Sequence, residues 1–248
     1  MMILKFFCLT LLLSFSSCTY IYYKGTNSEF YSTELFQDKN ALIDSTAMPY
    51  RQKVEQEMNI NIGSVEAVLK KEQPESNLGN WACDAVLEQT KLYTGKEVDF
   101  AILNYGGLRI GSIAAGNISK GKIFELMPFD NSLVIVEISG KELPLLFTHM
   151  IAKGGWPISS DLKLVGDKEG NIKSVSIKGL TLIDPDKIYR IATIDYLANG
   201  GDNCSFFIGK NQIETAVFLR DAMIENIEKK HKSGQKINAS KDGRFQIE

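Results

Sequence analysis

The sequence predicts an α+β fold, and three observations support this prediction. Segments 98–103 and 133–138 are short, mostly apolar runs with one acidic residue each, which are typical of buried strands. Segments 43–58 and 78–94 place apolar residues at helical spacing. Helices and strands do not alternate strictly along the chain, so the pattern favours a single α+β domain over a regular βα repeat.

Length and composition set the class of protein. The chain has 248 residues, of which 44% are hydrophobic and 23% charged, enough for a sizeable core. The formal net charge is -2 and there is no long basic run, which argues against a protein that binds a nucleic-acid backbone. A single nucleotide is still compatible with this composition, because one or two arginines can hold it.

The N-terminus has the pattern of an export signal. Lys5 precedes an apolar run, residues 6–15, which is too short to span a membrane and is followed by two serines and Cys18. An ordinary signal peptide and a lipoprotein signal both fit. The position of the cysteine at the end of the apolar run favours the lipoprotein. We therefore expect a signal at residues 1–18, lipidation of Cys18, and an exported chain anchored by lipid to a bacterial envelope membrane.

The folded domain is predicted to span residues 43–248, after a polar and aromatic tether at residues 19–42. Helices are expected at 43–58, 78–94, 140–152 and 213–232. The last of these rests on the helical spacing of Ile213, Val217, Ile224 and Ile227 and on a basic last turn. Strands are expected at 59–69, 98–103, 133–138, 158–165, 172–177, 189–193 and 245–247.

Capping residues and prolines mark the helix ends. Ser76 or Asn77 is expected to cap the helix at its start, and Gly95 to end it. Pro144 belongs in the first turn of its helix. Pro49 must lie in the first turn of its helix or kink it.

Cysteine and histidine content argues against a metal centre in this chain. Cys83 and Cys204 could form one disulfide, but Cys83 falls on the apolar side of a helix, which favours a buried free thiol. No CxxC motif occurs, and the two histidines, His149 and His231, are too few for a dinuclear site. His231 is expected in solvent, and His149 on the surface or in the core. With no GxSxG motif either, no self-contained hydrolytic centre is predicted.

Two glycine turns are the candidate walls of a pocket. One lies in segment 101–131, where a buried strand leads through Asn104 and a Gly-Gly pair to Arg109, then a hairpin-like turn and a short helix. The other lies in segment 191–207. An arginine beyond a glycine turn can hold a phosphate or carboxylate, or it can be a surface residue. Asn104 is either a turn cap or a ligand contact.

Three more residues add to this candidate site. Phe129 follows a proline in a polar turn, where it could stack on a base or fill the core. Tyr196 precedes the second glycine turn. Asp202 could accept hydrogen bonds from ribose hydroxyls or stabilise its own turn. Two aromatic side chains could hold a base between them by stacking.

Four motifs together resemble the C-terminal domain of the 5'-nucleotidase family. They are Glu75-Ser76-Asn77-Leu78-Gly79-Asn80 followed by Cys83-Asp84-Ala85, then Ile102-Leu103-Asn104-Tyr105-Gly106-Gly107-Leu108-Arg109, then Met127-Pro128-Phe129, and finally Tyr196-Leu197-Ala198-Asn199-Gly200-Gly201-Asp202. They occur in the family's order, and the resemblance runs from about residue 43 to 248. It implies a layered α/β/β/α fold and a domain that binds the nucleoside part of a substrate.

The resemblance also implies a set of substrate-binding residues: Asn104, Gly107, Arg109, Phe129, Tyr196 and Asp202. Phe129 and Tyr196 would be the two faces of a base clamp. Asp202 would hold the ribose. Asn104 would contact the base, and Arg109 the phosphate side.

Two further features follow from the comparison of motifs. Gly107 would let the backbone approach the ligand. A family arginine normally precedes the Asn-Leu-Gly-Asn motif, whereas segment 70–75 here has none, and a lysine substitutes only partly, as a point charge.

Full-length members of the family also carry an N-terminal metallophosphoesterase domain with two divalent metal ions. We expect no cofactor in this chain and a separate metallophosphoesterase chain as its partner, so that together they form a 5'-nucleotidase-type hydrolase. The alternatives are a stand-alone surface module that binds nucleosides without catalysis, and an inherited domain whose pocket is no longer used.

Overall fold

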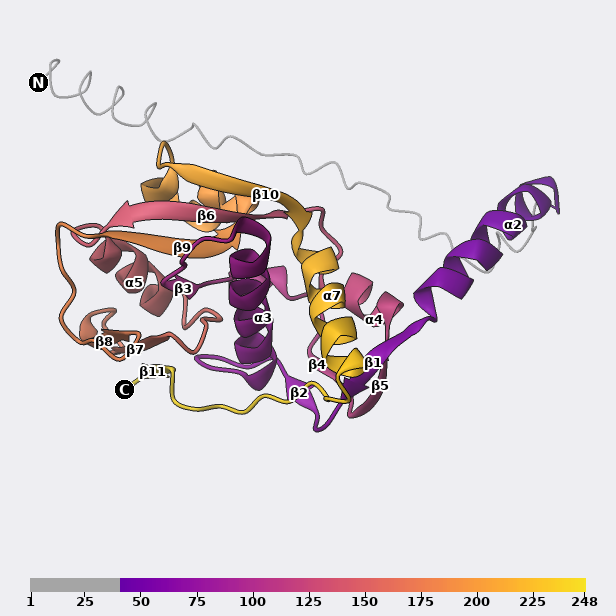
Figure 1. The fold of residues 1–248 in the computed structure, drawn as a ribbon, viewed down its shortest axis with the longest axis horizontal. Helices are drawn as coiled ribbons and strands as arrows, with labels where there is room; N and C mark the ends of the chain where they lie inside the picture. The colour runs from indigo at the N-terminus through magenta and orange to yellow at the C-terminus, as the bar shows by residue number, and fades with distance from the viewer. Residues whose placement is uncertain (1–40) are drawn as a thin grey trace, which may run out of the picture. The chain divides into compact units, whose positions relative to one another are not determined.

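A computed structural model of the chain describes residues 41–248 (Figure 1). The predicted signal at 1–18, its Cys18, and all but the last two residues of the predicted tether at 19–42 lie outside the described residues. Within the described part, no helix combines the length and the apolar character needed to cross a membrane.

The first described element is helix α2 (Ala41–Met58), which confirms the helix predicted at 43–58. Pro49 lies in the middle of α2 and not in its first turn. The chain divides into two units, residues 1–48 and 49–248. All described elements after α2 belong to the second unit.

A mixed four-stranded sheet with the order β10-β6-β9-β3 carries much of the core. Its strands are β3 (Phe100–Ala101), β6 (Ser132–Ser139), β9 (Ile188–Ile194) and β10 (Gln212–Phe218). Strand β6 runs antiparallel to both β9 and β10. Strand β3 runs parallel to β9, with Phe100 opposite Ile191 and Ala101 opposite Ala192. This parallel pair determines where the candidate site lies.

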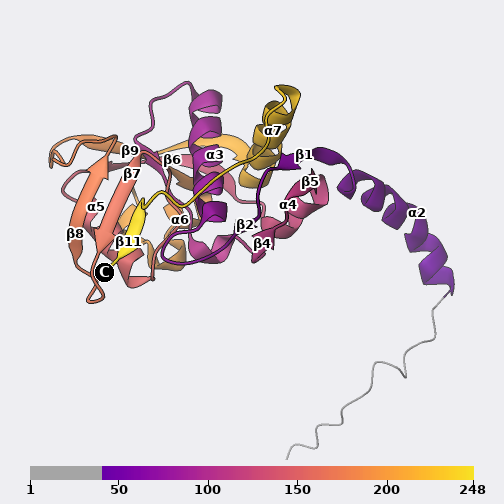
Figure 2. The same cartoon turned by 90° about the horizontal axis from the view of Figure 1, so that it is seen from below.

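Smaller sheets complete the unit. A three-stranded sheet with the order β11-β7-β8 contains β7 (Leu162–Gly166), β8 (Ile172–Ile177) and β11 (Phe245–Ile247). Figure 2 shows these three strands side by side at one end of the unit. Two ribbons pair β1 (Asn61–Val65) with β5 (Gly116–Ser119), and β2 (Leu69–Lys70) with β4 (Ser112–Ile113).

Helices cover these sheets and give the layered α+β architecture that the sequence predicts. Helix α3 (Asn77–Thr94) packs against the four-stranded sheet and against α7 (Leu219–Lys232). Helix α5 (Leu143–Ala152) packs against β7 and β8. The short helix α4 (Lys120–Leu126) contacts α7.

The predicted helix caps are confirmed. The Ser76 hydroxyl accepts a 2.9 Å hydrogen bond from the backbone N–H of Gly79 and so satisfies a free donor at the start of α3. Gly95 ends α3 at a φ of 61°, in the left-handed region that favours glycine. Pro144 lies in the first turn of α5.

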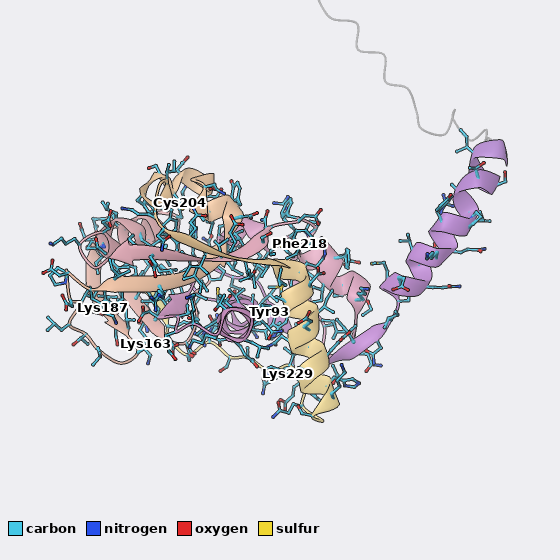
Figure 3. The ribbon with its side chains drawn as sticks, turned by 45° about the horizontal axis from the view of Figure 1, so that its top comes forward. Tyr93, Lys163, Lys187, Cys204, Phe218 and Lys229 are labelled. Carbon is cyan, nitrogen blue, oxygen red and sulfur yellow. The ribbon has the colours of Figure 1, made fainter. Side chains whose placement is uncertain are left out.

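The helix predicted at 213–232 is wrong over its first part. Residues Gln212–Phe218 form strand β10, and α7 begins only at Leu219. Figure 3 labels Phe218 at the junction of the two elements. The spacing of Ile213 and Val217 fits a strand as well as a helix, because both residues also lie on one face of a strand. β-branched residues are abundant here, and pairing with the buried strand β6 favours the strand.

Two other local predictions are revised, and one is confirmed. The strand predicted at 59–69 is interrupted between β1 and β2. The hairpin-like turn predicted after Arg109 does not join paired strands, since β4 pairs with β2 and β5 with β1. The buried free thiol favoured for Cys83 is confirmed: Cys83 and Cys204 are both free and buried, and burial raises the pKa of each.

Candidate nucleotide-binding site

One pocket of about 310 Å³ brings the two glycine turns together. Its lining residues are Asn104, Gly106, Gly107, Arg109, Phe129, Asn131, Tyr196 and Asp202. All six residues predicted from the sequence to bind substrate are in this set. The structure therefore places them together, and their contact with a ligand stays a prediction.

The parallel pairing of β3 and β9 explains this convergence. Parallel strands direct their carboxyl ends to the same edge of a sheet, and loops at that edge commonly form binding sites. Strand β3 ends at Ala101 and leads to the first glycine turn, and β9 ends at Ile194 and leads to the second. Residues more than ninety positions apart in the sequence therefore meet.

The first wall is a short 3-10 turn, Tyr105–Gly107, that follows Asn104. The backbone N–H of Gly107 donates to the carbonyl oxygen of Asn104 at 3.1 Å. A Cβ atom on Gly107 would lie 2.7 Å from Oδ1 of Asn104, which is too close for any other residue. After the turn, the N–H of Arg109 donates to the carbonyl of Leu126 at 2.8 Å and ties this wall to α4.

The second wall follows β9. Helix α6 (Asp195–Ala198) carries Tyr196, and Gly200 then turns the chain at a φ of 92°. A Cβ atom on Gly201 would lie 2.5 Å from the Tyr196 ring and from its carbonyl oxygen. Glycine is thus required here so that the turn can fold back over the tyrosine and present Asp202 to the pocket.

Asp202 is the centre of a polar network that joins the two walls. Its Oδ2 accepts a hydrogen bond from Nδ2 of Asn104 at 2.5 Å. Its Oδ1 accepts one from the Tyr196 hydroxyl at 3.1 Å, and its backbone N–H donates to the same hydroxyl at 3.1 Å. Asn104 is 6% exposed, and within the described part of the chain its Oδ1 has no hydrogen-bond partner. The network fixes the direction of the Asp202 carboxylate.

Two aromatic side chains at the pocket are exposed, with Phe129 at 41% and Tyr196 at 45% of their full accessibility. Such rings normally lie in the core, so their exposure at one pocket is a sign of a binding surface. The segment that carries Phe129 is held by Arg220 at the start of α7. That guanidinium donates to the Phe129 carbonyl at 3.4 Å and to Asp130 at 2.7 Å.

The pocket also has a positively charged side. The guanidinium of Arg109 lies 5.7 Å from the centre of the Phe129 ring and donates to the Gly106 carbonyl at 3.1 Å. Lys71 lies nearby, with Nζ 2.7 Å from the Leu108 carbonyl oxygen, and burial together with the Arg109 charge lowers its pKa. Neither Arg109 nor Lys71 pairs with a carboxylate among residues 41–248. This side is suited to an anionic group.

Sequence reasoning missed one polar residue of the pocket. Asn131 lines the pocket two positions after Phe129, and a polar residue just before the buried strand β6 is the signal that could have found it. Lys71 is not in the pocket lining, but of the two lysines in the segment where the family arginine is missing it is the one whose pKa the Arg109 charge lowers.

Across 41–248, no group of three or more His, Cys, Asp or Glu side chains is placed to hold a metal ion. His149 lies outside the pocket lining, with Nε2 3.0 Å from the carbonyl oxygen of Asp202.

The Asn104–Asp202 contact gives a testable prediction. In an Asn104→Asp variant two carboxyl groups would lie at hydrogen-bond distance, which raises the folded-state pKa of one of them above its unfolded value of about 4. The folded state then binds more protons, so the variant should lose roughly 1–4 kcal/mol of stability as the pH rises from about 4 to 8. Thermal denaturation at the two pH values measures this loss.

An Asn104→Ala variant is the matched control for that experiment. It loses the hydrogen bond without adding a charge, so its stability relative to the unsubstituted protein should change little with pH. Equal pH dependence in the two variants would contradict the contact.

Comparison with known proteins identifies the family to which this domain belongs. The family model described as the 5'-nucleotidase C-terminal domain matches residues 55–208. The protein UshA of Yersinia enterocolitica is 30% identical over 188 residues, which cover 72% of this chain and 32% of the relative. The trifunctional nucleotide phosphoesterase protein YfkN of Bacillus subtilis is 28% identical over 184 residues, covering 69% of this chain and 12% of the relative.

Among solved structures, a 5'-nucleotidase precursor from Thermus thermophilus matches with a TM-score of 0.70 and 25% identity, covering 84% of this chain and 43% of that one. The chain spans about a third of the length of its UshA relatives. The family model covers more than half of the sequence, and the fold agrees with it. The chain therefore belongs to the family of 5'-nucleotidase C-terminal domains.

Proposed function

We propose that residues 43–248 bind the nucleoside part of a nucleotide for a 5'-nucleotidase-type hydrolase, in nucleotide catabolism. One observation carries this proposal. Two exposed aromatic rings, a carboxylate held by hydrogen bonds and an arginine with no carboxylate partner among residues 41–248 line the same pocket. These groups match the base, the ribose and the phosphate of a nucleotide in turn. Relatives named as 5'-nucleotidases and as a nucleotide phosphoesterase support the substrate class.

Each part of the nucleotide has a partner in this proposal. The base stacks on Phe129 and Tyr196, which contributes ~1–3 kcal/mol per base. The Asp202 carboxylate accepts hydrogen bonds from the ribose hydroxyls with the lone pairs that its protein contacts leave open. Asn104 contacts the base edge, and Arg109 holds the phosphate by charge and by its planar, two-pronged geometry.

Gly107 and Lys71 complete the arrangement. Without a side chain at Gly107, the ligand can approach the backbone of the first turn. Lys71 adds a second positive charge near Arg109, as a point charge without the geometry of a guanidinium. Phosphate recognition in this proposal therefore depends mainly on Arg109.

Catalysis is proposed to come from a separate metallophosphoesterase chain that carries two divalent metal ions. The poverty of metal ligands in residues 41–248 motivates this division of labour. In the same proposal residues 1–18 are a lipoprotein signal, Cys18 carries the lipid, and residues 19–42 tether the domain to a bacterial envelope membrane. The phosphate of the bound nucleotide would be presented to the metal ions of the partner.

A stand-alone nucleoside-binding module is the alternative, because the exposed aromatics and the Asp202 network would serve capture as well as presentation. The two proposals predict different results when this chain is mixed with a metallophosphoesterase chain. Hydrolysis of adenosine monophosphate that needs both this chain and a metallophosphoesterase chain would favour the first, whereas tight binding with no effect on such a partner would favour the second.

The aromatic clamp gives the first prediction on binding. Phe129→Ala and Tyr196→Ala should each weaken adenosine binding by ~1–3 kcal/mol, because each removes one stacking face. Calorimetric titration of the purified chain measures the change. Leu92→Ala is the control, since Leu92 is exposed on α3 outside the pocket. Unchanged affinity in both aromatic variants would contradict the proposal that the base stacks on these two rings.

Arg109 gives the second prediction. Arg109→Ala should weaken the binding of adenosine monophosphate by roughly 1.5–3 kcal/mol, the range for a hydrogen bond to a charged group, and should affect adenosine much less. Lys163→Ala, a change on the exposed face of β7, controls for the loss of one positive charge (Figure 3). Equal losses for the two ligands would show that Arg109 is not on the phosphate side.

A further inference from the structure

His149 has a contact that the proposed function does not use. It lies on α5, outside the pocket lining, and its Nε2 is 3.0 Å from the main-chain carbonyl oxygen of Asp202. A carbonyl oxygen only accepts, so Nε2 carries the hydrogen and donates it. The helix thus reaches the second glycine turn from outside the pocket.

Two aromatic neighbours fix the imidazole ring of His149. Trp156 meets it edge to face, with ring centres 5.3 Å apart and planes at 87°. Phe206 does the same from another direction, at 5.6 Å and 69°. These contacts leave the ring little freedom to rotate. Burial, the largest effect on this group, lowers the pKa of His149.

The backbone that His149 contacts is strained. Asp202 has a φ of 50° and Asn203 a φ of 67°, and both lie in the left-handed region, which residues other than glycine seldom adopt, Asp and Asn more often than the rest. Such a conformation persists only where the surroundings hold it. The pocket side holds Asp202 through its N–H and its carboxylate, by means of Tyr196 and Asn104. His149 holds the carbonyl.

We propose that His149 is a positioning residue for ribose recognition. By holding the carbonyl of Asp202, it keeps the strained turn in place and so directs the carboxylate toward the ribose hydroxyls. This inference rests on the proposed function, in which Asp202 is the ribose contact. It predicts a defect that is confined to the ribose hydroxyls and does not extend to stacking of the base.

Two variants and two ligands test this role. His149→Phe keeps an aromatic ring between Trp156 and Phe206 but removes the donor. His149→Gln keeps an amide N–H that can reach the position of Nε2. The ligands are adenosine and 2',3'-dideoxyadenosine, which differ only in the ribose hydroxyls, and the measurement is calorimetric titration of the full chain.

The wild-type chain should bind adenosine more tightly than the dideoxy analogue. In His149→Phe that preference should fall roughly tenfold, because the hydrogen bonds to the carboxylate are misaligned. The affinity for the dideoxy analogue should stay within about twofold, which a general loss of structure would not allow. His149→Gln should recover most of the preference.

Four results would overturn the inference. A preference retained in both variants, or an equal loss of affinity for both ligands in both variants, would leave His149 as a packing residue only, with the proposed function intact. A wild-type chain that binds both ligands equally would remove the ribose role of Asp202, and the inference with it. A wild-type chain that binds neither would contradict the proposed function itself.

Discussion

The parallel pairing of β3 with β9 is the constraint on which the candidate site depends. It aligns the carboxyl ends of two strands that are nearly a hundred residues apart in the sequence. Each strand leads directly into a glycine turn, so the pairing alone brings Arg109 and Asn104 close to Tyr196 and Asp202. Strand β6 lies on the other side of β9 and starts just after Phe129. The third part of the pocket thus comes from the neighbouring strand of the same sheet.

Within that frame, close packing and a few hydrogen bonds set the details of the site. Gly107 and Gly201 allow each turn to lie against a side chain of the site, where any Cβ atom would collide. Asp202 joins the two turns through Asn104 and Tyr196. The strained backbone of this aspartate is supported from both sides, which is a common arrangement where a side chain must be held in one direction before a ligand arrives.

Much of this could be predicted from the sequence, because the signals are local. The cap at Ser76 and the stop at Gly95 define α3 by residues that lie within a few positions of the helix ends. The pocket residues occur in short motifs that resemble those of a known family. That resemblance predicts six substrate-binding residues, and all six line the pocket.

What the sequence did not reveal depends on contacts between distant segments. Strand β10 was expected to be helical, because apolar spacing over a few residues fits both structures and pairing with β6 decides between them. The closeness of Lys71 to Arg109 and of His149 to Asp202 results from the fold of segments 38 and 53 residues apart. No local pattern marks either pair.

The central claim is that this pocket binds a nucleoside without any metal ion. The most direct test is calorimetric titration of the purified full chain with adenosine and adenosine monophosphate in the presence of a chelator. The account predicts saturable binding of both ligands at one site, with the monophosphate bound more tightly if, as proposed, Arg109 holds the phosphate. Absence of binding to both ligands in the folded chain would contradict it.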